Sequence, residues 1–96
     1  MFLAGRISKD PELKLLPNNK KLVQFNVGTK QFGARTWITC EAWGEGAEKI
    51  SNWFRKGDTI FLEGKFQTQN WKNGGFPKEK LVLIVEKFQN PQKSEE

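Results

Sequence analysis

The sequence lacks histidine and tyrosine altogether, and Cys40 is its single cysteine. One cysteine excludes a disulfide within the chain and a zinc site built from cysteines. The lack of histidine excludes imidazole acid–base catalysis and metal ligation by imidazole. The carboxylates show no catalytic pairing and there is no Gly-rich phosphate loop, so we expect no enzyme, no cofactor and no metal site.

Long hydrophobic runs are also missing from this chain of 96 residues. No stretch approaches the roughly 20 apolar residues of a membrane-spanning helix, and Met1 is not followed by the basic region and apolar stretch of a signal peptide. Hydrophobic residues make up only 36% of the sequence, which limits the core that one small domain can bury. These absences predict a cytoplasmic domain without membrane contact, with the interior of an organelle as the alternative.

Positive charge and aromatic side chains are what the sequence does contain. Sixteen basic residues against eleven acidic ones give a net charge of +5, which points to an anionic partner without identifying it. The basic residues are scattered, so a charged tail-like arm is not expected. Four tryptophans and eight phenylalanines are many for a small core, and part of this aromatic content is therefore expected on a surface.

The segment from Thr36 to Trp43 alternates like a half-buried strand, in which successive side chains point to opposite faces. One face carries small apolar side chains and the other carries both tryptophans: Ile38, Cys40 and Ala42 against Trp37, Thr39, Glu41 and Trp43. An indole on the polar face of a sheet needs a packing partner, and in a basic chain the obvious candidate is a base of a polyanionic strand. The alternative is that the indoles pack under a loop or at a subunit interface.

The remaining patterns predict five short strands and one helix. Strands are expected at 2–7 (resuming at 13–16), 22–30, 36–43, 59–69 and 80–85, with a hairpin loop at 73–75. A helix is expected over 44–56, with Arg55 and Lys56 in its last turn and Gly57 as its stop. Five strands with one helix after the third are the pattern of an OB-fold barrel. We therefore predict an all-β OB-fold domain over residues 1–88, followed by a short polar tail over residues 89–96.

Four blocks of sequence carry a family likeness in their order along the chain: Gly5 to Leu13, Trp37 to Gly44, Arg55 to Asp58 and Leu62 to Lys65. With these blocks the chain closely resembles the bacterial single-stranded DNA-binding protein family over roughly residues 2 to 88. The resemblance implies an OB-fold that wraps single-stranded DNA without sequence preference, usually as an oligomer. Bases stack on aromatic rings in this family, while lysines and arginines follow the phosphates.

The resemblance also implies a set of DNA-binding residues in this chain. Trp37, Trp43 and Trp71 match stacking positions, Phe32 lies near a fourth, and Lys56 matches a phosphate contact after the helix. Five further cations are expected beside the aromatic set: Arg6, Lys30, Arg35, Lys65 and Lys72. A loop phenylalanine can equally cap the barrel, which is the alternative for Phe32. Lys20 and Lys21 are expected to be ordinary solvated charges, Trp53 to be partly buried, and Phe61 to lie on an outer surface or an interface.

The chain departs from the family pattern in several places. The resemblance implies a homotetramer as the first expectation. A dimer is the second, because the first strand of this chain is short and one interface between subunits can be lost with it. The sequence ends without an acidic, aromatic tip, so recruitment of partners through such a tip is not expected. Glu45 and the neutral run 67–70 occupy positions that are often basic in the family. Glu41 falls on the tryptophan face, where it should repel phosphate unless a lysine or arginine pairs with it.

The leading functional hypothesis is sequence-nonspecific binding of single-stranded DNA in replication, recombination or repair. One alternative is an OB-fold accessory protein of the primosomal replication protein B type, which acts mainly through protein partners; the tryptophan set argues against it. Another is RNA binding in the manner of cold-shock domains, which is compatible with basic charge and aromatic residues. The chain lacks the closely spaced aromatic motifs of that family.

Overall fold

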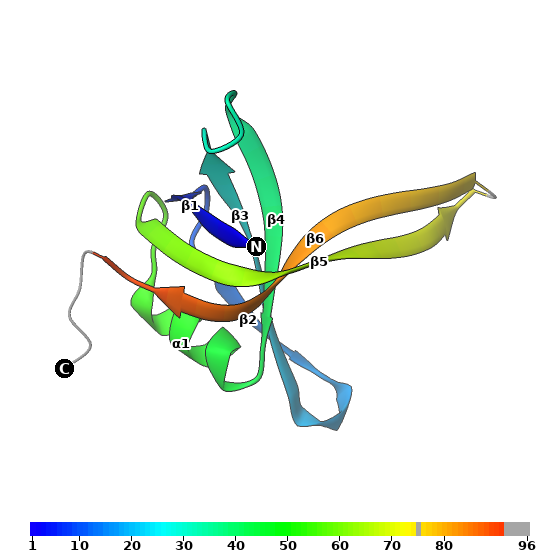
Figure 1. The fold of residues 1–96 in the computed structure, drawn as a ribbon. Helices are drawn as coiled ribbons and strands as arrows, with labels where there is room; N and C mark the ends of the chain where they lie inside the picture. The colour runs from blue at the N-terminus through cyan, green and yellow to red at the C-terminus, as the bar shows by residue number, and fades with distance from the viewer. Residues whose placement is uncertain (75, 92–96) are drawn as a thin grey trace.

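The computed structural model describes residues 1–74 and 76–91, and for residues 71–73 and 76–78 it describes the backbone alone. The elements follow one another as β1 (Phe2–Ile7), β2 (Glu12–Leu16), a short 3-10 turn (Pro17–Asn19), β3 (Lys20–Thr29), β4 (Thr36–Trp43), α1 (Glu45–Trp53), β5 (Thr59–Asn73) and β6 (Phe76–Gln89). Figure 1 shows the strands wound around one another, with α1 at one end of the barrel. The resumed first strand expected at 13–16 is β2.

Five strands form a closed ring in the order β1, β5, β6, β4 and β3, and a β1–β3 pairing at Arg6 and Ile7 closes it. β2 continues the sheet from β3, so β1 and β2 together act as the interrupted first strand of the barrel. The pairing of β4 with β6 is parallel, while the other pairings are antiparallel. With α1 between the third and fourth strands of the ring, this arrangement confirms the predicted OB-fold.

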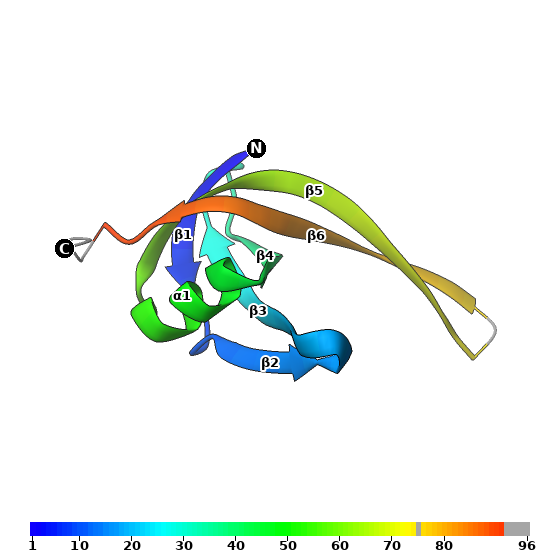
Figure 2. The ribbon, with the colours of Figure 1, turned by 90° about the horizontal axis from the view of Figure 1, so that it is seen from below.

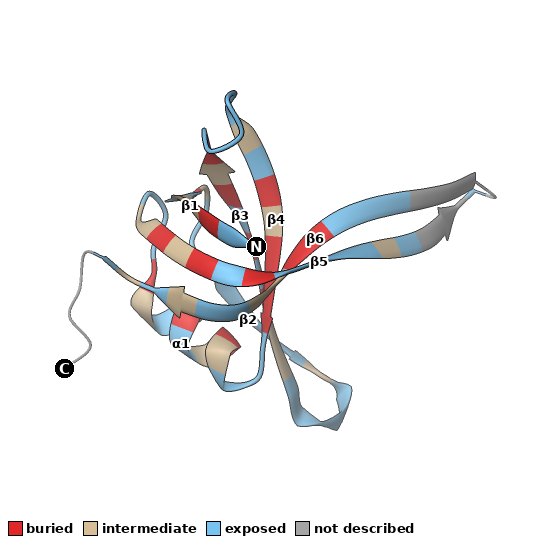
Figure 3. Cartoon of the chain, in the orientation of Figure 1, coloured by how far each residue is buried: buried red, intermediate tan, exposed pale blue. Residues whose placement is uncertain are grey.

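The core lies inside the ring and beneath α1 (Figure 2). Alternate residues of the strands point into it, and Ala47 and Ile50 of α1 cover one end. The largest fully buried side chains include Phe54, Leu3 and Ile60. Each such side chain contributes about 1.5–3 kcal/mol by burial. Figure 3 shows this alternation as bands of buried and exposed residues along the strands.

The helix ends three residues earlier than the sequence pattern predicts. Phe54 is already extended, with φ −120° and ψ 147°, because its ring turns into the core and packs edge-on against Phe88 at 6.1 Å. Arg55 and Lys56 therefore lie beyond the helix rather than in its last turn. The Arg55 guanidinium donates to the carbonyl of Ser51 at 2.9 Å, which satisfies one of the free carbonyls at the helix end.

Beyond Gly64 the β5–β6 hairpin leaves the barrel and projects from it as an arm (Figure 1). We define the arm as residues 66–74 of β5 and its turn together with residues 76–81 of β6. The pairing register shifts between Glu63 and Gly64, where an added Cβ would collide with the carbonyl oxygen of Ile84. Phe66 shares the alternation of Ile60 and Leu62, a pattern that predicts an inward side chain, but it lies past this bulge and is 37% exposed.

Candidate nucleic-acid interface

The outer face of β3 and β4 carries the residues of interest. The antiparallel register sets four cross-strand pairs side by side on this face: Gly28 with Trp37, Asn26 with Thr39, Gln24 with Glu41, and Leu22 with Trp43. Trp37 is 57% exposed and Trp43 is 45% exposed, while the alternating Ile38, Cys40 and Ala42 are buried. The face assignment made from the alternation of the sequence is confirmed. The two indoles stand about 20 Å apart along β4, at roughly 3.3 Å per residue.

A hollow beside Trp37 gathers four cations from three separate parts of the chain. Its basic lining residues are Arg6 of β1, Lys30 and Arg35 of the loop before β4, and Lys56 after α1. Two hydrogen bonds fix the turn that carries Lys56. The Lys56 N–H donates to the Asp10 carboxylate at 2.6 Å, and the Gly57 N–H donates to the Ile7 carbonyl at 2.8 Å. One exposed indole is thus flanked by four positive side chains, all of them predicted from the sequence.

A second hollow lies beside Trp43, at the opposite end of β4. Its other lining residues are Asn19, Lys20, Lys21, Gly44, Glu45 and Glu48. The Lys21 ammonium is held by Glu48 at 2.9 Å, whereas Lys20 is exposed. From the sequence, Lys20 and Lys21 were expected to be ordinary solvated charges and not neighbours of the indole. The signal was available in the β3–β4 pairing, since Leu22 opposite Trp43 brings the start of β3 to this end of the face.

A third hollow, which we call the middle hollow, lies between the two tryptophans. It is lined by Ser8, Lys9, Asp10, Glu12, Lys14, Gln24, Phe25, Asn26, Thr39 and Lys80. The Thr39 hydroxyl donates to the Asn26 side-chain carbonyl at 3.0 Å on its floor. Lys9, Lys14 and Lys80 come from the β1–β2 connection, β2 and the arm, and no local pattern in the sequence linked them.

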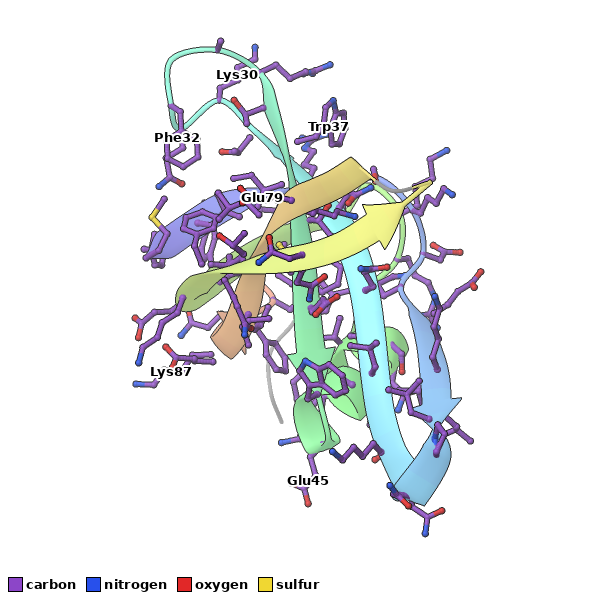
Figure 4. All side chains as sticks on the ribbon, turned by 90° about the vertical axis from the view of Figure 1, so that its right-hand side faces the viewer. Lys30, Phe32, Trp37, Glu45, Glu79 and Lys87 are labelled. Atoms are coloured by element: carbon purple, nitrogen blue, oxygen red, sulfur yellow. The ribbon has the colours of Figure 1, made fainter. Side chains whose placement is uncertain are left out.

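Two predicted site residues lie away from these hollows. Phe32 is 49% exposed at the loop between β3 and β4, and Figure 4 shows it beside Lys30 in that loop. Gln31 ties this loop to β1, because its side-chain amide donates to the Phe2 carbonyl at 2.7 Å and accepts from the Ala4 N–H at 3.1 Å. Lys65 lies on β5, lines none of the three hollows, and has its ammonium 4.0 Å from Glu86. The side chains of Trp71 and Lys72 fall outside the described residues.

Glu41 corrects an expectation. It was expected to repel phosphate on the tryptophan face unless a lysine or arginine paired with it. It is only 5% exposed, and its carboxylate accepts hydrogen bonds from the side-chain amides of Gln24 and Gln69, each at 3.0 Å. The carboxylate is thus satisfied by two neutral amides and withdrawn from solvent.

Two further aromatic residues lie where the sequence placed them. Trp53 is half-buried, 6.1 Å from the ring of Phe88, with the Lys49 ammonium 5.8 Å from its own ring. Phe61 lies on the outer side of β5, its ring 6.3 Å from that of Phe2. Neither belongs to the hollows on the outer face of β3 and β4.

The described residues offer no support for catalytic or metal chemistry. Among them there is no group of three or more Cys, Asp and Glu residues that could hold a metal ion. Burial raises the pKa of the Cys40 thiol to about 12, so it is not a nucleophile at neutral pH. In the same part of the chain, no helix has both the length and the apolar character needed to cross a membrane.

A closed five-stranded barrel with an aromatic and basic outer face defines an OB-fold domain with the features of a nucleic-acid binder. Residues 1–91 match the Single-strand binding protein family, and the chain belongs to that family. This confirms the resemblance and the expectation of a domain without enzymatic activity, since the proteins of this family bind DNA and are not enzymes.

Curated relatives resemble the chain over about three quarters of its length. It is 36% identical over 80 residues to Single-stranded DNA-binding protein A of Bacillus subtilis, covering 76% of this chain and 46% of the relative. It is 35% identical over 80 residues to Single-stranded DNA-binding protein 3 of Streptococcus agalactiae, covering 76% of this chain and 58% of that protein. The chain thus spans about half the length of the relatives that it matches.

Proposed function

We propose that this domain binds single-stranded DNA without sequence preference, by stacking bases on Trp37 and Trp43 and neutralising phosphates with the surrounding cations. The observation that carries the proposal is the hollow beside Trp37, where an indole that is 57% exposed is flanked by Arg6, Lys30, Arg35 and Lys56. An exposed indole offers a surface for any base, because every base has a π face. Four cations around it suit the phosphates on either side of that base.

The two kinds of contact contribute in different ways. Stacking contributes about 1–3 kcal/mol per base and tolerates any sequence. Each neutralised phosphate adds affinity that falls with salt. For single strands, each one steepens the slope of log affinity against log salt by about 0.7. Because the cations gather in hollows beside the tryptophans, each stacked base has phosphate contacts close by.

The relatives' names support single-stranded DNA as the partner, and the family supports a role in replication, recombination or repair. We extend this to a location on bacterial DNA, where single strands arise in those processes. We also propose that the domain works as a homo-oligomer, a tetramer before a dimer. The exposed Phe2 and its neighbour Phe61 leave an apolar area on the outer side of β1 and β5 that a second copy could cover.

Titration of tryptophan fluorescence tests the proposal directly. Homopolymeric single-stranded DNA should quench the emission, whereas duplex DNA of equal length should leave it unchanged, because the indoles need unpaired bases to stack. Homopolymeric RNA in a parallel titration measures the preference between the two nucleic acids. An absence of quenching by any single strand at low salt would refute single-strand binding and favour an accessory role through protein partners.

A further inference from the structure

The arm stands on the outer face between the two tryptophans. Gln69 and Lys80 are opposite each other in the arm, and they contact the face at different places. Gln69 bonds to Glu41 of β4, while Lys80 lines the middle hollow. In Figure 4, Trp37 lies on one side of the arm and Glu45, which lines the hollow of Trp43, lies on the other. A strand that runs from one tryptophan to the other must therefore pass the base of the arm.

Glu41 fastens this base to the face below it. One carboxylate oxygen accepts from Gln24 of β3 and the other accepts from Gln69 of the arm, each at 3.0 Å. Hydrogen bonds to an ionised carboxylate are stronger than those between neutral groups. Because a buried carboxylate is costly without such partners, both amides are held where they are. The carboxylate thus connects two elements that are distant in the sequence.

The direction of the arm depends on contacts at its base. A two-stranded hairpin that is not backed by other strands is marginally stable on its own in water. The adjoining part of β6 pairs with β4 at Val82 and Thr39, which fixes where the arm begins. The bond between Glu41 and Gln69 acts just beyond this point, still at the base of the arm, where β5 and β6 pair only with each other. It is therefore placed to set the angle at which the arm leaves the barrel.

We propose that Glu41 is a positioning residue that holds the arm against the outer face and so forms the middle hollow as a passage for the DNA backbone. Lys80 moves with the arm, and it is Glu41 that keeps it in the lining of the hollow together with Lys9 and Lys14. The three lysines would contact phosphates of the nucleotides that lie between the two stacked bases. This inference rests on the proposed function, because it gives the passage its ligand.

The test replaces one neutral amide by a second carboxylate. Gln69→Glu places like charges against each other at the base of the arm and should release it. Gln67→Glu is the matched control, because it adds the same charge two residues away on the same face of β5, at an exposed position. Adding Glu41→Gln to Gln69→Glu restores one amide and one carboxylate with their roles exchanged, so this double variant should hold the arm again.

Two measurements are needed for each variant. The first is hydrogen exchange of the arm amides without DNA, which should become about tenfold faster or more in Gln69→Glu. The second is the salt dependence of binding to homopolymeric thymidine strands. Its slope should fall by about 0.7 for each phosphate that the middle hollow no longer neutralises. Quenching by a base at Trp37 should persist, and the double variant should recover both the exchange rates and the slope.

The outcomes separate this inference from the proposed function. Equal exchange rates and equal slopes in Gln69→Glu and Gln67→Glu would overturn the role of Glu41. The role of Glu41 would also be overturned if the double variant melted at the temperature of the parent but did not recover its exchange rates and salt slope. If the parent protein binds no single strand, the proposed function and the passage both fall. The exchange rates alone then decide whether Glu41 holds the arm.

Discussion

Trp37 lies flat over the backbone of Gly28 on the neighbouring strand. A Cβ added at Gly28 would stand 2.7 Å from Cζ3 of the indole and 2.9 Å from Cη2. Both distances are shorter than atoms can approach without one of them moving. The glycine thus supplies the space in which the indole rests, and the ring reaches its exposed position because β3 has no side chain there.

Substitution of Gly28 by alanine should therefore impair DNA binding, although none of the proposed DNA-binding residues is replaced. The added methyl group displaces the indole, and we expect affinity for single strands to fall by roughly the worth of one stacked base, about 1–3 kcal/mol. A shift in the tryptophan emission of the free protein should accompany the loss. Fluorescence titration and an emission spectrum measure both.

Gly46→Ala is the control for this experiment. A Cβ at Gly46 would meet only Cε1 of Phe88 at 3.9 Å, an ordinary contact, and the position lies within α1. Alanine is favoured over glycine inside a helix by about 1 kcal/mol, so this variant should be at least as stable as the parent and should bind DNA equally well. Equal binding by Gly28→Ala and Gly46→Ala would show that the position of the Trp37 ring does not matter.

Replacing the tryptophans one at a time should distinguish those that stack on DNA bases from the one that stabilises the fold. Trp37→Ala, Trp43→Ala and Trp71→Ala should each weaken single-strand binding by about 1–3 kcal/mol without unfolding the domain. Trp53→Ala should instead lower the melting temperature, because Trp53 packs against Phe88 and the core. Melting curves and titrations on the same samples distinguish the two effects. Loss of binding in a well-folded Trp53→Ala variant, with Trp37→Ala unaffected, would contradict the assignment of faces.

The alternation of β4 explains why the fold and the Trp37 hollow could be predicted. Period-two patterning fixes which side chains share a face, and this required no knowledge of distant contacts. The end of α1 was missed because Phe54 leaves the helix to bury its ring, and that choice depends on Phe88 at the other end of the chain. Propensity within the segment contains no information about such a partner.

The surroundings of Glu41 show a second limit of the sequence. Its parity was predicted correctly, but its partner Gln69 was not, because Gln69 comes from β5 and reaches β4 only where the hairpin leaves the barrel. The same is true of Lys80, which joins Lys9 and Lys14 through the position of the arm. Where a long hairpin departs depends on the bulge at Gly64, and this is a property of the assembled sheet.

Cys40 should make the domain sensitive to alkali. Burial raises the pKa of its thiol from the ordinary 9.0 to about 12 in the folded state. The stabilising contribution of the neutral thiol is complete below pH 9 and is lost as the pH rises toward 12, since the unfolded chain ionises first. Denaturant unfolding of the parent at several pH values should show this decline, and Cys40→Ala should flatten it. An identical decline in both proteins would show that another group is responsible.

The apolar area at Phe2 and Phe61 should promote self-association. Phe2 is 55% exposed and stands against Phe61 at a ring distance of 6.3 Å. Sedimentation at tens of micromolar, roughly the range in which modest interfaces form, should show an oligomer of the parent. Phe2→Ser should shift the distribution toward monomer, whereas Leu15→Ser, which removes a still more exposed apolar side chain on β2, should not. A parent that sediments as a compact monomer would contradict the proposal of an oligomer.

Glu45 provides a test of how charge near Trp43 controls the salt dependence. It lines the hollow of that indole together with Lys20 and Lys21, and it is exposed, so it repels a phosphate bound there. Glu45→Lys should tighten single-strand binding and steepen the salt slope by up to about 0.7, the value of one additional phosphate contact. The substitution also places a positive charge in the first turn of α1, which should cost about 0.3–1 kcal/mol of stability.

Glu63→Lys is the matched control, since Glu63 is exposed on β5 opposite Phe2 and lines none of the three hollows. It adds the same net charge and should raise affinity only through the general field, without a comparable change in slope. Titrations at several salt concentrations compare the two. Equal slopes for the two variants would place Glu45 outside the path of the DNA, and the proposed interface would then end before Trp43.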